Sequence, residues 1–85
     1  MEFTKHFKYM VNERKIREEW INQTLNEPDR MEQHEDGTIH FIKRIPENGG
    51  RWLRIVINSS ISPNRAITAF FDRRLRRSKN ENQSR

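Results

Sequence analysis

The spacing of apolar residues changes from a helical period to a strand period near Arg30, which restricts the folds open to this chain. Two apolar stripes precede Pro28, made of Phe3, Phe7, Met10 and Val11 and of Ile16, Trp20, Ile21 and Leu25. Their three- and four-residue intervals predict two helices, the first capped by Thr4 and the second running from about Arg17 to Asn26. We expect the helical hairpin to break between Arg14 and Ile16.

Four strand-like segments follow the predicted helices. Asp36-Gly37 separates the first two, and we expect a two-residue hairpin turn there because both residues tolerate positive φ. PENGG and SSISPN form the later turns, and RWLRIVIN and RAITAFF form the last two strands. The order ααββββ predicts an α+β fold, with two N-terminal helices on one face of a four-stranded antiparallel sheet.

Alternation within the last two strands assigns their side chains to two faces of the sheet. The core face receives Leu53, Ile55, Ile57, Ile67, Ala69 and Phe71. The open face receives Trp52, Arg54, Val56, Ala66, Thr68 and Phe70, with His40, Ile42 and Arg44 expected beside them. An open face with aromatic rings and arginine can stack a base and hold its phosphates. Alternatively, Trp52 and Phe70 form a second small core.

The length of 85 residues leaves room for one domain with a modest core. We place this domain at residues 1–77 and expect the polar segment 78–85 to be disordered. The absence of cysteine excludes disulfides and fits a reducing compartment. No apolar run is long enough for a signal peptide or a membrane span, so we expect a cytoplasmic protein with no membrane partner.

Charge is distributed unevenly along the chain. Residues 1–42 carry six Lys or Arg against nine Asp or Glu, whereas residues 43–77 carry nine against two. A basic region of this kind, in a chain with a sequence pI near 10.2, is typical of proteins that bind nucleic acid. The alternative is that the arginines keep a small domain soluble.

Few residues are candidates for catalysis. His6, His34 and His40 lack the i, i+4 spacing of a helical zinc site, and no carboxylate cluster completes a set, so we expect neither a metal nor a small-molecule cofactor. Metal-free RNA cleavage requires proton transfer and cations around the phosphorane, for which histidine and arginine are suited. His6 and Arg14 lie at the apolar stripe of the first helix. Structural roles remain open for both, since His6 can bond a backbone carbonyl and the helix dipole favours Arg14.

The segments TKHFKYMVNERKIREEWINQTLNEPD, RWLRIVIN and RAITAFFDRR together resemble a small family catalogued as a domain of unknown function. That family looks related to the BrnT-type and RelE-type toxins of bacterial toxin–antitoxin pairs. The resemblance covers residues 4–74. It implies a small basic ribonuclease with N-terminal helices and an antiparallel sheet.

The resemblance also assigns individual positions. The family pattern matches His6, Met10, Glu13, Arg14, Ile16, Thr68, Arg73 and Arg74. The chain departs from the pattern at Tyr9, where arginine is usual, at Lys15, where glycine is customary, and at Arg17, where Ser or Thr caps the second helix.

These observations lead to one functional hypothesis and one alternative. We expect a toxin-like, metal-independent endoribonuclease that binds RNA and is neutralised by a cognate antitoxin. Its expected catalytic residues are His6, Arg14, Arg54, Thr68 and Arg73. Its expected RNA-binding residues are Lys43, Arg44, Arg51, Trp52, Arg74, Arg76 and Arg77. A non-catalytic module that binds nucleic acid or protein is the alternative, and a helix-edge site around His6 and Arg14 competes with a site on the open sheet face.

Overall fold

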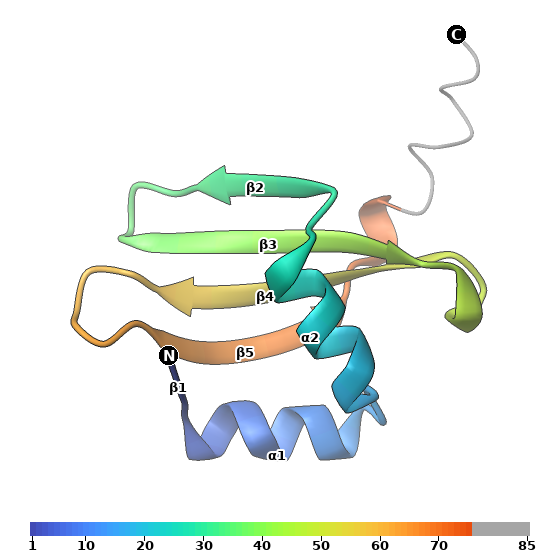
Figure 1. Ribbon diagram of the computed structural model, residues 1–85, viewed down its shortest axis with the longest axis horizontal. Helices are drawn as coiled ribbons and strands as arrows, with labels where there is room; N and C mark the ends of the chain where they lie inside the picture. Colours follow the sequence, from blue (N-terminus) through green and yellow to red (C-terminus); the bar gives the residue numbers. More distant parts are fainter. Residues whose placement is uncertain (76–85) are drawn as a thin grey trace, which may run out of the picture.

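The computed structural model describes residues 1–75, in which five strands form one mixed sheet (Figure 1). The strands are β1 (Glu2–Phe3), β2 (Arg30–Gln33), β3 (Thr38–Ile45), β4 (Arg51–Asn58) and β5 (Arg65–Phe71). They lie in the order β1-β5-β4-β3-β2, and β1 and β5 form the one parallel pair among these strands. The predicted α+β class is confirmed, but the predicted four-stranded antiparallel sheet lacks β1.

Strand β1 is held by its backbone. Glu2 N donates to Asn64 O at 2.9 Å and Thr4 N donates to Ala66 O at 3.2 Å. A strand of two residues is too short to produce an alternating pattern, so the sequence contains no signal for it.

Two α-helices precede the antiparallel strands, α1 (Lys5–Glu13) and α2 (Glu18–Asn26), and a 3-10 turn, η1 (Pro46–Asn48), lies within the predicted PENGG turn. Thr4 caps α1 as predicted, because its Oγ1 accepts from Phe7 N at 3.0 Å. Arg17 stands at the N-cap of α2 and forms no side-chain cap.

The helical hairpin breaks at the predicted place, through a C-terminal motif centred on Lys15. Ile16 N donates to Val11 O at 3.0 Å, and Lys15 N donates to Asn12 O at 3.2 Å. This pair of bonds is the Schellman motif, which requires a left-handed residue after the C-cap. Lys15 fills that position with φ 54°.

The core lies between the two helices and one face of the sheet. In Figure 1, α2 crosses the central strands while α1 runs beside β5. The buried apolar residues of this cluster are Phe7, Ile16, Trp20, Ile21, Ile45, Leu53, Ile55, Ile57, Ala66 and Ala69. The predicted core positions on β4 are therefore confirmed, and the alternate positions of β4 face the other side.

A register shift between Val56 and Ile57 corrects one predicted assignment. Beyond this shift Ala66 pairs with Ile57 and is fully buried in the core, although alternation placed Ala66 on the open face. Ile67, which alternation placed in the core, is half-buried and lies outside the core cluster. A β-bulge inserts one residue and so reverses the side of every residue beyond it.

The β2–β3 hairpin forms as predicted, but its loop is longer than two residues. His34 N donates to Thr38 O, and Gly37 N donates to His34 O. Gly37 has φ 88°, whereas Asp36 stays at negative φ. This is the geometry of a three-residue loop whose glycine occupies the left-handed position.

None of the helices within residues 1–75 has the length and apolar character needed to cross a membrane. The predicted domain boundary at residue 77 and the predicted tail 78–85 lie outside the described residues.

Candidate functional site

Arg54 is the centre of a polar cluster on the open face of the sheet. Its side chain leaves β4 and is almost entirely buried. Nε donates to Asp72 Oδ2 at 2.9 Å, and Nη1 donates to Glu32 Oε1 at 3.0 Å and to His40 Nδ1 at 2.8 Å. Nη2 has no acceptor among residues 1–75. Three partners therefore fix the guanidinium, and two N–H donors remain for a ligand.

The strand register brings these partners together. Ile42 of β3 and Phe70 of β5 stand opposite Arg54 on the two neighbouring strands. Glu32 of β2 stands opposite His40 of β3, so their side chains share the face of Arg54. Directly opposite residues in an antiparallel pair have β-carbons about 4.5–5.5 Å apart, which brings the carboxylate and the imidazole within reach of Arg54.

His40 lies in a row of hydrogen bonds that runs from Arg54 through His40 and Thr38 to Asp36. A guanidinium can only donate, so Nδ1 of His40 carries a lone pair toward Arg54. Nε2 then donates to Thr38 Oγ1 at 3.2 Å, and that hydroxyl donates to Asp36 Oδ1 at 2.6 Å. Burial, followed by the charges of His34 and Arg54, lowers the pKa of His40 below its usual range. The imidazole is therefore neutral near pH 7.

Glu32 remains ionised across the ordinary pH range. Donation from Arg30 at 2.7 Å, and then from Arg54, lowers the pKa of Glu32 from 4.5 to about 2. Its Oε1 also accepts from His34 Nε2 at 3.1 Å. The rings of His34 and His40 stack with centroids 3.8 Å apart.

Asp72 joins the buried Arg54 to an exposed arginine. Its Oδ2 accepts from Arg54 Nε and from Arg74 Nη2, and its Oδ1 accepts from the backbone and Nε of Arg74. Donation from Arg74, with a further contribution from Arg54, lowers the pKa of Asp72. Because the side chain of Arg74 is 81% exposed, this second guanidinium can meet a ligand.

Two hollows flank Phe70 on this side of the molecule. The first, of about 430 Å³, is lined by Glu32, His34, His40, Arg54, Phe70, Asp72, Arg74 and Leu75. The second is lined by Arg14, Arg51, Phe70, Phe71 and Arg73. A larger hollow of about 590 Å³ lies apart, where Lys43 Nζ is held by Glu27 O and Asp29. The fixed cation with spare donors makes the first hollow the candidate site.

The structure brings some of the predicted site residues to these two hollows. Arg54 and Arg74 line the first, and Arg14, Arg51 and Arg73 line the second. Arg14 Nη1 also donates to Ala69 O at 2.8 Å, at the edge of β5. Thr68 lies on the open face opposite Val56.

Other predicted site residues lie elsewhere. His6 is exposed on α1, about 12 Å along the helix axis from Arg14, and lines neither hollow. Lys43 shares the helix side of the sheet with Leu53, so it faces away from the candidate site. Arg44 and Trp52 pair on the open face but outside both hollows. Residues 76 and 77, both arginine, lie outside the described residues.

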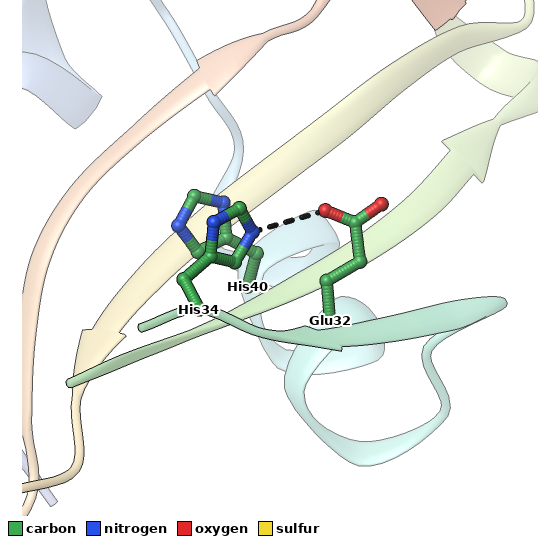
Figure 2. Close-up of side chains that lie close together, drawn as sticks. All are labelled: Glu32, His34 and His40. Atoms are coloured by element: carbon green, nitrogen blue, oxygen red, sulfur yellow. Dashed lines mark hydrogen bonds and ion pairs between the residues drawn. The ribbon is translucent and has the colours of Figure 1, made fainter. Parts of the chain in front are cut away.

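Sequence reasoning did not assign Glu32, His34, His40 or Asp72 to the site, although it placed His40 on the open face. The helical spacing test for metal ligands could not find a set that assembles across a β-ladder. Figure 2 shows Glu32 beside the two stacked histidines, and the donor atoms of the three lie within 4.8 Å of one another. The useful signal was the hairpin itself, which brings His40 back beside the residues that precede Asp36.

A comparison with known proteins identifies the family. The model of a domain of unknown function (DUF4258) matches residues 3–71. No curated protein and no solved structure matches the chain significantly. Because the matched segment spans most of the chain, the protein belongs to the DUF4258 family.

Proposed function

We propose that this protein is a toxin-type endoribonuclease that cleaves RNA without a metal ion. The observation that supports this proposal is Arg54, a buried guanidinium fixed by three partners with Nη2 unoccupied among residues 1–75. A cation held in place before the substrate arrives stabilises developing negative charge without reorganisation. The phosphate to be cleaved would bind at Nη2 of Arg54.

The residues around Arg54 supply the other needs of this reaction. His40 Nδ1 accepts from Arg54 Nη1 at 2.8 Å, so a phosphate that binds the guanidinium must first draw Arg54 away from this nitrogen. The freed Nδ1 would then lie close to the phosphate and accept the proton of the 2′-hydroxyl, while the leaving 5′-oxygen takes a proton from water. Thr38 and Asp36 keep the other ring nitrogen protonated. Arg74 adds a second cation at the rim, and Phe70 offers a ring on which a base can stack.

The second hollow extends this binding surface. Arg14, Arg51 and Arg73 surround Phe70 and Phe71 there, and the guanidinium of Arg51 lies 5.7 Å from the ring centre of Phe71. Since Phe70 lines both hollows, RNA lying across this ring would place neighbouring phosphates near arginines on both sides.

Single-turnover cleavage of a mixed-sequence RNA in EDTA tests the proposal. His40→Ala should lower the cleavage rate by about 10²-fold or more while its melting curve shows a folded protein. His6→Ala is the matched comparison, because the sequence predicted His6 as a catalytic residue whereas the geometry supports His40. Loss of cleavage in His6→Ala alone would move proton transfer to the helix edge.

The same assay separates the ribonuclease from the alternative function. If wild-type protein binds the RNA and leaves it intact in EDTA, the protein is a binding module and the enzyme proposal is wrong.

The kinship with BrnT-type and RelE-type toxins, and the cognate antitoxin, are part of this proposal. An antitoxin that inhibits by covering the site would present acidic side chains to the arginines of the two hollows. Co-expression with the product of the neighbouring gene tests this point, since a cognate antitoxin should co-purify with the protein and protect RNA from it. Co-purification that leaves cleavage unchanged would contradict neutralisation.

A further inference from the structure

The β2–β3 hairpin gathers three side chains that can bind a metal ion. Glu32 and His40 stand directly opposite each other, and His34 follows Glu32 by two residues on the same side (Figure 2). Their donor atoms all lie within 4.8 Å of one another. The two imidazole rings are stacked with an angle of 16° between their planes, so they are already close together before any ligand arrives.

We infer that Glu32, His34 and His40 form a binding site for Zn²⁺, and that zinc binding at this site breaks the hydrogen bond between His40 and Arg54. Two imidazole nitrogens and one carboxylate oxygen suit a borderline divalent cation better than Mg²⁺ or Ca²⁺, which prefer oxygen ligands. The lone pair of an imidazole nitrogen lies in the plane of its ring, so the two stacked rings must turn toward each other before both can bind one zinc ion.

The effect on Arg54 follows from the two nitrogens of His40. A metal ion at Nδ1 must displace the guanidinium, because Nδ1 accepts from Arg54 Nη1. A metal ion at Nε2 forces the imidazole proton onto Nδ1, where it faces a group that can only donate. Either arrangement ends the contact between His40 and Arg54.

Charges around the hairpin limit the affinity of this site for zinc. Arg30 and Arg54 both donate to Glu32 and repel a dication. Asp36 is connected to His40 by two hydrogen bonds that pass through the hydroxyl of Thr38. Zinc must therefore compete with two guanidinium groups for the carboxylate. Zinc binding weakens the contacts of Arg54 with Glu32 and His40, and these contacts weaken zinc binding by the same factor.

The first test measures zinc binding without RNA, on protein that carries no histidine tag. Calorimetric titration with Zn²⁺ should give one site per chain, and His34→Ala should weaken that site at least about tenfold. His34 is partly exposed, so the variant should keep its fold. His6→Ala is the matched control, since His6 is an exposed histidine outside the cluster, and it should bind zinc as the wild type does. Absence of a one-to-one site, or an equal loss in His6→Ala, would overturn the inference.

The second test follows the ring nitrogens of His40 by ¹⁵N NMR. Without zinc, Nε2 should be protonated and Nδ1 should not; with zinc, either Nδ1 becomes metal-bound or the proton moves to Nδ1. A His40 ring that keeps its pattern while zinc binds would show that the metal ion does not break the contact with Arg54.

The consequence for activity rests on the proposed function and is tested separately. Zinc at a concentration that fills the site should inhibit RNA cleavage by the wild type at least about tenfold, and the ratio of rates with and without zinc should return toward one in His34→Ala. Equal zinc inhibition of both proteins would contradict inhibition through this site. If the wild type cuts no RNA in EDTA, the ribonuclease proposal fails while the calorimetric result still decides the metal site.

Discussion

At the scale of single residues, the site depends on a buried arginine, Arg54, that donates hydrogen bonds to two carboxylates. Taking a guanidinium out of water costs several kcal/mol unless good hydrogen bonds replace the lost hydration. Asp72 is itself buried and accepts from both Arg54 and Arg74, while Glu32 closes the other side. These contacts hold the guanidinium of Arg54 in one position, which a phosphate-binding group requires.

Acid should weaken the folded state through these two carboxylates. The folded-state pKa of Asp72 is lowered and that of Glu32 is about 2, so the folded protein binds fewer protons than the unfolded chain near pH 4. Their contribution to stability is present above the unfolded pKa values, which lie at about 4 to 4.5, and is lost as pH falls toward 2. Urea unfolding between pH 2 and 7 should show Asp72→Asn and Glu32→Gln losing less stability on acidification than wild type. Parallel curves for all three proteins would contradict this account.

Lys15 adopts a backbone conformation that suits glycine better. A left-handed φ costs a non-glycine residue roughly 1–2 kcal/mol. Replacement by glycine recovers only part of this cost, because glycine loses more conformational entropy when the chain folds. Lys15→Gly should therefore raise the free energy of unfolding by about 0.5–1 kcal/mol, measured by urea denaturation. Lys8→Gly makes the same exchange inside α1 and should lower it by about 1 kcal/mol. A loss of stability in Lys15→Gly would show that the lysine side chain contributes more than its strain.

At the scale of elements, the loop of one hairpin decides which residues of β2 reach the site. The sequence predicted this hairpin, and it predicted His40 and Arg54 on one face. A two-residue loop at Asp36-Gly37 would have paired Gln33 with His40, whereas the three-residue loop pairs Glu32 with His40. One residue of register moves every side chain of a strand to the other face. The period of the strands alone therefore could not place Glu32 in the site.

A change of strand register also limits prediction at β5. Periodicity correctly assigned the core residues of β4, because that strand is regular over its length. The bulge beside Val56 carries no sequence signal, such as a glycine, so alternation placed Ala66 and Ile67 on the wrong sides. Asp72 follows β5, and no local sequence pattern predicts its contact with Arg54 of β4.

Substitutions at these two positions test the bulge. Ala66→Asp would bury an unpaired carboxylate in the core and should lower the free energy of unfolding by at least about 3 kcal/mol. Ile67→Asp changes a half-buried position and should cost about 1–2 kcal/mol. Thermal and urea unfolding give both values, and the circular dichroism spectrum shows whether Ala66→Asp folds at all. An unbroken alternation along β5 predicts the reverse order of the two effects.

At the scale of the whole molecule, the basic part of the chain gathers around Phe70. Arg54 and Arg74 come from one side of this ring, and Arg51 and Arg73 come from the other, all within residues 43–77. Arg14 joins them from the end of α1, which belongs to the half of the chain with excess acidic residues. Positive charge that is spread along the sequence is thus brought to one side by the fold, where it can neutralise several phosphates together.

Binding of RNA to this side should depend strongly on salt. Each phosphate contact releases counterions from single-stranded RNA, and the slope of log K against log salt changes by about 0.7 per contact. Arg51→Gln with Arg73→Gln should therefore make the slope shallower by about 1 to 1.5, measured by fluorescence anisotropy with an uncleaved RNA analogue. Lys5→Gln with Lys8→Gln removes the same charge from α1, outside both hollows, and is the matched control. If the control pair changes the slope as much as the arginine pair does, net charge attracts RNA and the two hollows have no special part in holding it.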